Sequence, residues 1–171
     1  MGKRVSIIDR KRRTVRTQDA MGEVRVKIKL TNAIDEGMFR RGKLKASQVR
    51  SYIADALVDT GSVRTVLPPD VVKRLGLQIR GKRVAEYADG RKEEVGVTES
   101  IIIEWNGQDC IEDALVLGDE VLIGQTVLET LDLFVDCARQ RLVPNPAHPD
   151  QAVTKVKKQR NDNPKRTRRE Q

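Results

Sequence analysis

The sequence predicts a mainly β protein, an antiparallel barrel or sandwich with one or two short helices. Three observations lead to this prediction. Apolar and charged residues alternate along residues 24–30, which indicates a strand with one buried face. Asp89-Gly90 and Asn106-Gly107 are two-residue hairpin signals. The other apolar runs are short and separated by turn residues, which argues against a parallel sheet with regular crossover helices.

The individual elements follow from local patterns. A hairpin is predicted over residues 84–97, and short helices over residues 68–76, opened by proline and closed by glycine, and 125–131. Residues 31–48 lack periodicity and predict a long, basic, exposed loop that can include a helical turn. The predicted strands cover residues 24–30, 49–53, 56–58, 63–67, 101–105, 110–114, 115–117, 121–124, 133–135 and 141–143.

Composition and charge divide the chain into three parts. The 171 residues suffice for one domain, and with 3% aromatic residues its core must be aliphatic. The net charge of +8 resides in the ends, because residues 1–20 and residues 147–171 each carry +5, leaving −2 for residues 21–146. We therefore expect a flexible basic N-terminal extension (1–20), a folded domain (21–146) and a disordered basic C-terminal tail (147–171).

The positive charge of the two ends is a feature that nucleic-acid-binding proteins share. Such tails can hold phosphate backbones weakly and in a salt-dependent way. They lack interleaved aromatic residues for base stacking, however, and solvated ends are the commoner interpretation. Met1-Gly2-Lys3-Arg4 does not begin a signal peptide, and no apolar run approaches transmembrane length. Cys110 and Cys137 show no zinc spacing, so we expect a cytoplasmic protein with free thiols and no membrane contact.

The stretch that carries the chemistry is Ala56-Leu57-Val58-Asp59-Thr60-Gly61-Ser62. A short apolar strand here delivers a carboxylate to its end, and a buried charge requires compensating hydrogen bonds. Gly61 permits a tight turn, and the hydroxyls of Thr60 and Ser62 can bond backbone or carboxylate. An ordinary strand followed by a turn explains the same residues. The choice between a structural turn and a functional carboxylate therefore depends on the rest of the chain.

Other chemistries have less support. His148 is the only histidine, so neither a histidine-based triad nor a histidine-rich metal site is available within one chain. No glycine-rich phosphate loop precedes a helix. We expect no metal and no cofactor.

Three features stand in order along the chain: the strand ending in Asp59-Thr60-Gly61-Ser62, the polar hairpin tipped by Asp89-Gly90, and Leu122-Ile123-Gly124 before a short helix. Together they resemble the retropepsin-like aspartic proteases, the single-lobe relatives of pepsin, over roughly residues 24–144. The resemblance implies a closed antiparallel β-barrel of the acid-protease type. It also implies an aspartic endopeptidase that acts on peptide or protein substrates.

The resemblance assigns Asp59 as the catalytic residue. Two close carboxylates share one proton, one acting as base on a water and the other donating to the carbonyl oxygen. The chain has a single Asp-Thr-Gly, so the second carboxylate would come from a second copy in a homodimer. Thr60 would bond across the two-fold axis, Gly61 would bring backbone N–H groups near the carboxylate, and Ser62 would bond its outer oxygen.

The resemblance assigns the remaining site residues to support and substrate binding. Leu122, Ile123 and Gly124 would pack beneath the active-site turn. Tyr87, Ala88, Asp89 and Gly90 would form the flap over an extended substrate. The charged flap tip and the long 31–48 segment depart from the viral pattern.

Two alternatives stay open at this stage. One is a non-catalytic peptide-binding module on the same fold. The other is a nucleic-acid-associated protein that acts through its basic tails.

Overall fold

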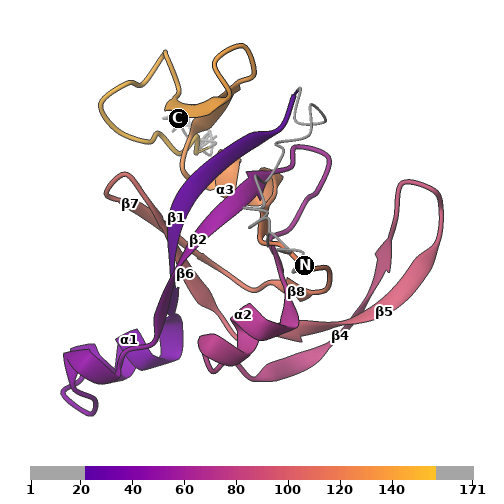
Figure 1. Ribbon diagram of the computed structural model, residues 1–171. Helices are drawn as coiled ribbons and strands as arrows, with labels where there is room; N and C mark the ends of the chain where they lie inside the picture. The colour runs from indigo at the N-terminus through magenta and orange to yellow at the C-terminus, as the bar shows by residue number, and fades with distance from the viewer. Residues whose placement is uncertain (1–21, 157–171) are drawn as a thin grey trace, which may run out of the picture.

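The computed structural model describes residues 22–156 and is mainly β, with few and short helices. Most of the strands form one nine-stranded sheet that curls around the core (Figure 1). The bounds of the elements are β1 Val24–Asn32, α1 Ala33–Arg40, the 3₁₀ turn η2 Ala46–Gln48, β2 Ser51–Val58, β3 Val66–Leu67, α2 Pro69–Arg74, β4 Ile79–Glu86, β5 Lys92–Thr98, β6 Ile101–Trp105, β7 Gln108–Glu112, β8 Leu115–Val116, β9 Leu122–Ile123, α3 Gln125–Thr130, β10 Leu133–Asp136 and β11 Arg141–Pro144.

The strand order in the large sheet is β4-β5-β8-β3-β9-β2-β1-β6-β7, and β10 and β11 form a separate pair. The prediction of a mainly β fold is confirmed. Two pairs are parallel, β2 with β9 and β3 with β8, and they depart from the antiparallel pairing that the sequence predicts for most of the sheet. Among the described residues, β4 and β7 each pair with one neighbour, and the closed barrel is not confirmed.

The alternating pattern of the first strand has the predicted effect. Val24, Ile28 and Leu30 are buried in the core, and the charged residues between them face outward. The core is aliphatic, with Tyr52 and Trp105 only at its border. The largest of its fully buried apolar side chains are Ile28, Leu30, Leu67, Leu75, Ile101, Ile103, Ile123 and Val127.

Two predicted strand boundaries were wrong. The strands predicted over residues 49–53 and 56–58 are one continuous strand, β2, which begins at Ser51, because Asp55 lies on its exposed face opposite Lys27 of β1 and does not interrupt the pairing. The strand predicted over residues 63–67 is reduced to β3, because residues 60–65 form the turn after Asp59 and the segment that follows it.

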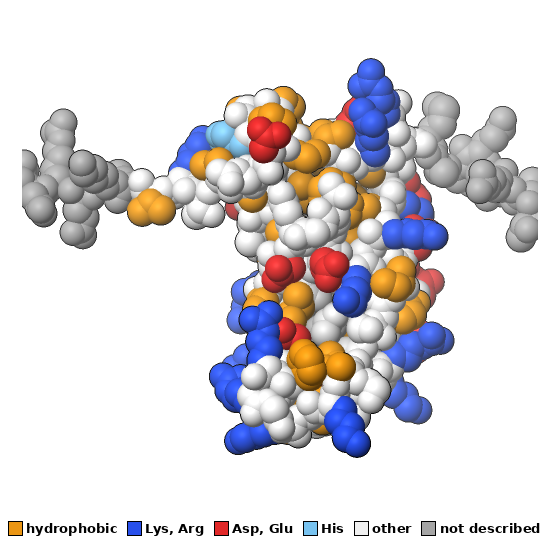
Figure 2. Space-filling model, turned by 90° about the vertical axis from the view of Figure 1, so that its left-hand side faces the viewer, with side chains coloured by type: hydrophobic (Ala, Val, Ile, Leu, Met, Phe, Trp, Pro, Cys, Tyr) orange, Lys and Arg blue, Asp and Glu red, His pale blue; other side chains and the backbone are white. Residues whose placement is uncertain are grey.

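The segment 31–48, predicted as a loop, contains α1 and η2. Asn32 caps α1, its side chain accepting bonds from the backbone N–H groups of Ile34 and Asp35 at 2.9 and 3.1 Å. Basic side chains follow the helix, and Figure 2 shows Lys and Arg gathered around this end of the molecule. The helix is therefore an ordered addition to the sheet.

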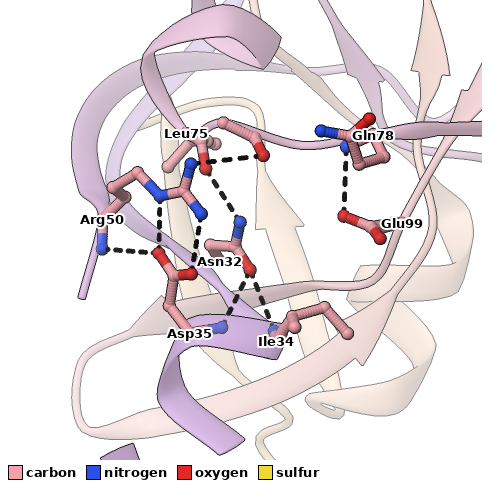
Figure 3. A network of polar contacts seen from close by, with 8 residues as sticks. Asn32, Ile34, Asp35, Arg50, Leu75, Gln78 and Glu99 are labelled. Carbon is pink, nitrogen blue, oxygen red and sulfur yellow. Dashed lines mark hydrogen bonds and ion pairs between the residues drawn. The ribbon is translucent and has the colours of Figure 1, made fainter. Parts of the chain in front are cut away.

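A polar network fastens α1 to the start of β2 and the end of α2 (Figure 3). Asp35, whose side chain is 7% exposed, accepts two guanidinium bonds of 2.7 Å from Arg50, together with the Arg50 backbone N–H. Asn32 donates to the carbonyl of Leu75 at 2.9 Å. A Cβ at Gly76 (φ +60) would lie 1.6 Å from the guanidinium of Arg50, so the glycine that ends α2 leaves space for this ion pair.

The two predicted terminal segments are described only in part. Residues 1–20 and residues 157–171 lie outside the described residues. Within residues 147–156, His148 and Val153 bond the carboxylate of Asp132 at 2.7 and 3.1 Å. In the described part of the chain, no helix is long and apolar enough to cross a membrane.

Candidate active site

Asp59 stands at the end of β2, where the pairing with β9 fixes its backbone. Its N–H donates to the carbonyl of Ile123 at 3.0 Å. Its carboxylate is partly exposed, and Oδ1 accepts a 2.9 Å bond from the N–H of Gly61. The Ser62 N–H donates to the Asp59 carbonyl at 3.2 Å and closes the turn. Strand and turn together present one carboxylate at the sheet surface with a backbone donor on one of its oxygens.

Gly61 and Thr60 occupy the exposed part of this turn. A Cβ at Gly61 would lie 3.2 Å from Asp59 Oδ1, tighter than ordinary van der Waals contact. The absence of a side chain at Gly61 therefore gives the carboxylate access to the backbone N–H. Thr60 faces an open hollow on the molecular surface and is among the residues that line it.

The structure places the Ser62 hydroxyl away from the carboxylate. Ser62 Oγ donates to the carbonyl of Arg64 at 2.9 Å, whereas the family resemblance implies a bond to the outer carboxylate oxygen. The short side chain satisfies the backbone of its own turn. The second oxygen of Asp59 has no hydrogen-bond donor among the described residues.

Leu122, Ile123 and Gly124 lie directly against the turn. Leu122 and Ile123 pair in parallel with Leu57 and Val58. A Cβ at Gly124 would lie 2.6 Å from the carbonyl oxygen of Ser62 and under 3 Å from two backbone atoms of Arg64. Only glycine allows this approach without displacing backbone. The N–H of Gln125 then donates to the Ser62 carbonyl at 2.8 Å, which anchors the start of α3 to the turn.

Glu112 is a structural residue that the sequence analysis missed. Its carboxylate accepts bonds from the hydroxyls of Thr65, which follows the turn, and Thr126, which belongs to α3. The Thr126 bond measures 2.7 Å, and the same hydroxyl lies 3.0 Å from the carbonyl of Val63. Glu112 thus ties the segment after the turn to α3. The glutamate is remote in sequence from both threonines, so no local pattern could have revealed it.

The predicted flap is the β4–β5 hairpin, which extends away from the rest of the sheet in Figure 1. The N–H of Tyr87 donates to the Arg91 carbonyl at 2.8 Å, and that of Gly90 to the Tyr87 carbonyl at 2.8 Å. Asp89 pairs with Arg91 at 2.6 Å, and the guanidinium of Arg91 stacks 5.2 Å from the Tyr87 ring centroid. Ala88 is exposed beside them. The tip is therefore held by charge and aromatic contacts.

The hollow beside Thr60 has a volume of about 780 Å³. Phe134 of β10 lines it and is 53% exposed. The hollow is lined by Thr60, Gln125, Leu128, Glu129, Thr130, Asp132, Leu133, Phe134, Val135, Val153, Thr154 and Lys155.

The described residues offer no competing centre. They contain no group of three or more His, Cys, Asp or Glu side chains arranged to hold a metal. Burial raises the pKa of the Cys110 thiol to about 12, which keeps it protonated and unsuited to nucleophilic attack. No second carboxylate in the described part of this chain bonds Asp59.

Comparison with known proteins shows what this chain is similar to. Residues 48–101 match the aspartyl protease family model, a segment that contains both the Asp59 turn and the hairpin tip. No match is found among curated proteins. The resemblance to the retropepsin-like aspartic proteases is confirmed over this segment.

Two solved structures are similar in fold. The first is the EIAV protease complexed with the inhibitor HBY-793, which is 16% identical in sequence. The alignment covers 66% of this chain and 91% of the protease chain, with a TM-score of 0.45. The second is the retroviral protease-like domain of Ddi1 from Leishmania major, which is 17% identical in sequence. The alignment covers 72% of this chain and 88% of the Ddi1 domain, with a TM-score of 0.47.

Proposed function

We propose that the protein is an aspartic endopeptidase whose active site forms between two copies of the chain, each contributing Asp59. The observation that carries the proposal is the geometry of the turn. A carboxylate stands at the end of a strand with one buried face, with the Gly61 N–H on one oxygen and the other oxygen open. The match of residues 48–101 to aspartyl proteases supports the same chemistry.

The reaction needs two carboxylates that share one proton. Two negative charges a few ångströms apart are costly, so the pair binds a proton that neither group would hold alone. The ionised carboxylate removes a proton from a water, which attacks the peptide carbonyl carbon, while the protonated carboxyl donates to the carbonyl oxygen. The carboxyl that took its proton from the water then gives a proton to the leaving amine as the C–N bond breaks. A hydroxyl of the tetrahedral intermediate returns its proton to the other carboxylate as the carbonyl re-forms, and the pair again holds one proton.

The face around Thr60 supports a homodimer. An open hollow with the half-exposed Phe134 adjoins the active-site turn. A two-fold axis at the turn would cover this apolar surface and bring the two Asp59 carboxylates together. The β4–β5 hairpin of each copy would then close over an extended peptide held by backbone hydrogen bonds.

Asp59→Asn is the direct test. The variant keeps the size of the side chain and one acceptor for the Gly61 N–H, so it should fold and dimerise while losing peptidase activity. Inhibition of the wild type by a statine-type transition-state analogue would support the mechanism. Best activity is expected at mildly acidic pH, because one shared proton is required. Activity that survives in a folded Asp59→Asn protein contradicts the proposal.

The charged hairpin tip favours one second candidate, a peptide-binding module without turnover. Peptide binding that is unaffected by Asp59→Asn, in a wild type that cleaves no peptide, would support this candidate. A role for the basic tails with nucleic acid predicts instead that deletion of residues 1–20 and 147–171 abolishes function, whereas a protease core would keep its chemistry.

A further inference from the structure

The β4–β5 hairpin has two chemically different faces. Residues directly opposite in an antiparallel pair share a face. Arg83 lies opposite Val95, and Gly81 lies opposite Val97. Both valines are buried, at 4% and 7% exposure, so Arg83 is on the face that turns toward the molecule.

A bulge adds a second cation to that face. The register shifts between Ile79 and Gly81, which leaves Arg80 as the extra residue of β4. In a bulge two residues of one strand oppose a single residue of the other, and here Arg80 and Gly81 both oppose Val97. The bulge therefore places Arg80 opposite Val97, next to the part of β4 that carries Arg83.

A hollow of about 230 Å³ opens at this place, which is room for one side chain. It is lined by Arg80, Gly81, Lys82, Arg83, Val97 and Asp113.

One ion pair connects this hollow to the active-site turn. Asp113, in its wall, pairs with the guanidinium of Arg64. The carbonyl of Arg64 in turn accepts the hydroxyl of Ser62, three residues after Asp59. A peptide that extends from the Asp59 carboxylate along the hairpin would pass this hollow.

Three cations of the hairpin form ion pairs within it. Lys82 pairs with Glu94, Arg91 with Asp89 and Lys92 with Glu86, at 2.7, 2.6 and 3.3 Å.

On the inward face, Glu93 accepts the hydroxyl of Tyr87 at 2.6 Å, and Asp113 is neutralised by Arg64. Arg80 and Arg83 form no ion pair with any described residue, so two guanidinium groups remain available to a ligand.

We propose that this hollow is a binding subsite for an acidic side chain, Asp or Glu, of the peptide substrate. The inference rests on the proposed function, because it places the substrate between the hairpin and the Asp59 turn. A guanidinium group binds a carboxylate through two parallel N–H bonds, which a neutral amide of the same shape cannot match in strength. The apolar side chain of Val97 would contact the methylene part of the acidic residue.

The test separates binding from turnover by using the Asp59→Asn protein. Pairs of peptides that differ by Glu against Gln at one position are scanned along the sequence, and their dissociation constants are measured by fluorescence anisotropy. At one position the Glu peptide should bind about tenfold more tightly than the Gln peptide, the scale of a charge-assisted bond. In Arg80→Gln/Arg83→Gln on the same background this preference should disappear.

Lys92→Gln is the matched control, because it removes one positive charge from the outward face of the same hairpin. It should keep the preference for Glu. Arg83→Lys, which keeps the charge but loses the fork of donors, should retain only part of it.

A Glu-to-Gln affinity ratio near one at every position in the Asp59→Asn protein overturns the subsite. An unchanged preference in the double variant, or absence of any peptide binding, also overturns it. The proposed function fails separately, when wild-type protein cleaves none of the peptides that the Asp59→Asn protein binds.

Discussion

The carboxylate of Asp35 and the guanidinium of Arg50 form a two-pronged ion pair, with both bonds at 2.7 Å, between the first turn of α1 and the residue before β2. The hydrogen bonds from Arg50 lower the pKa of the Asp35 carboxyl below its ordinary value. The pair thus fastens the segment that follows β1 to the strand that carries Asp59.

Replacing Asp35 with Asn should lower the free energy of unfolding by roughly 1–2 kcal/mol, because Arg50 loses a charged acceptor in a largely buried position. Asp70→Asn is the control. Asp70 pairs with Arg74 at 3.9 Å with both side chains about two-thirds exposed, so its loss should cost roughly 0.5 kcal/mol or less. Urea denaturation measures both, and equal effects would contradict this account.

The same pair predicts a pH dependence. Because the folded-state pKa of Asp35 is lowered, its stabilisation is complete above the ordinary carboxyl pKa and is lost as pH falls through the folded value. The difference in stability between wild type and Asp35→Asn should therefore be constant near neutral pH and shrink on acidification below about pH 4. A difference that grows toward acid pH would have the wrong sign.

Gly124→Ala should destabilise the protein by roughly 1–3 kcal/mol, the usual range for overpacking. The added Cβ would lie 2.6 Å from the Ser62 carbonyl oxygen, and the turn and α3 must separate to admit it. Gly81→Ala is the matched control, since a Cβ there meets nothing within 4 Å. Thermal unfolding compares the two variants. A Gly124→Ala protein as stable as Gly81→Ala would show that the turn and α3 are not in close contact.

Glu112→Gln should weaken the connection between the turn and α3. The two hydroxyls donate to different oxygens of the carboxylate, and the amide replaces one of these acceptors with an NH2 donor, so one of the two threonines loses its charged acceptor. We expect a loss of stability of roughly 1 kcal/mol and a lower kcat with little change in KM. Thr126→Val should reproduce the effect, and Glu112→Gln combined with Thr126→Val should cost less than the sum of the two single changes.

Asp132→Asn should release the chain after β11. The Asp132 carboxylate accepts bonds from Asn145, His148 and the backbone N–H of Val153, and these bonds lower its pKa. Hydrogen exchange at the Val153 amide should become faster in the variant. Asp136→Asn is the control, because Asp136 bonds Arg139 and Arg141, which lie in the β10–β11 hairpin and not in the segment after β11. Unchanged exchange in Asp132→Asn would mean that other contacts hold this segment.

The sequence predicted those elements whose signals are local. The alternation over residues 24–30 and the Asn106-Gly107 turn, where both residues have positive φ, each have one stable structural solution. The capping residue Asn32 and the acidic residues after it also signal a helix, but Gly37 and the basic residues beyond it favoured a loop. Asp55 suggested a break in β2, and only its pairing opposite Lys27 shows that it lies on the outer face.

The candidate site was predictable to the extent that it is one tripeptide and its neighbours. The contacts that position it are tertiary. Glu112 reaches two threonines that lie 47 residues before it and 14 residues after it, and the acceptor that Ser62 uses depends on the path of the chain after the turn. Such partners follow from the folded topology, which residue spacing alone does not encode.

The ion pair of Asp35 and Arg50 has a mechanical consequence for β2. Arg50 anchors the beginning of the strand, and the bond from the Asp59 N–H to the Ile123 carbonyl anchors its end. A strand that is fixed at both ends cannot slide along its neighbours. A slip of one residue would move the chain by about 3.3 Å and turn every side chain to the opposite side of the sheet. The ion pair between Asp35 and Arg50 thereby helps to fix the position of the Asp59 carboxylate along the strand and the face of the sheet from which it projects.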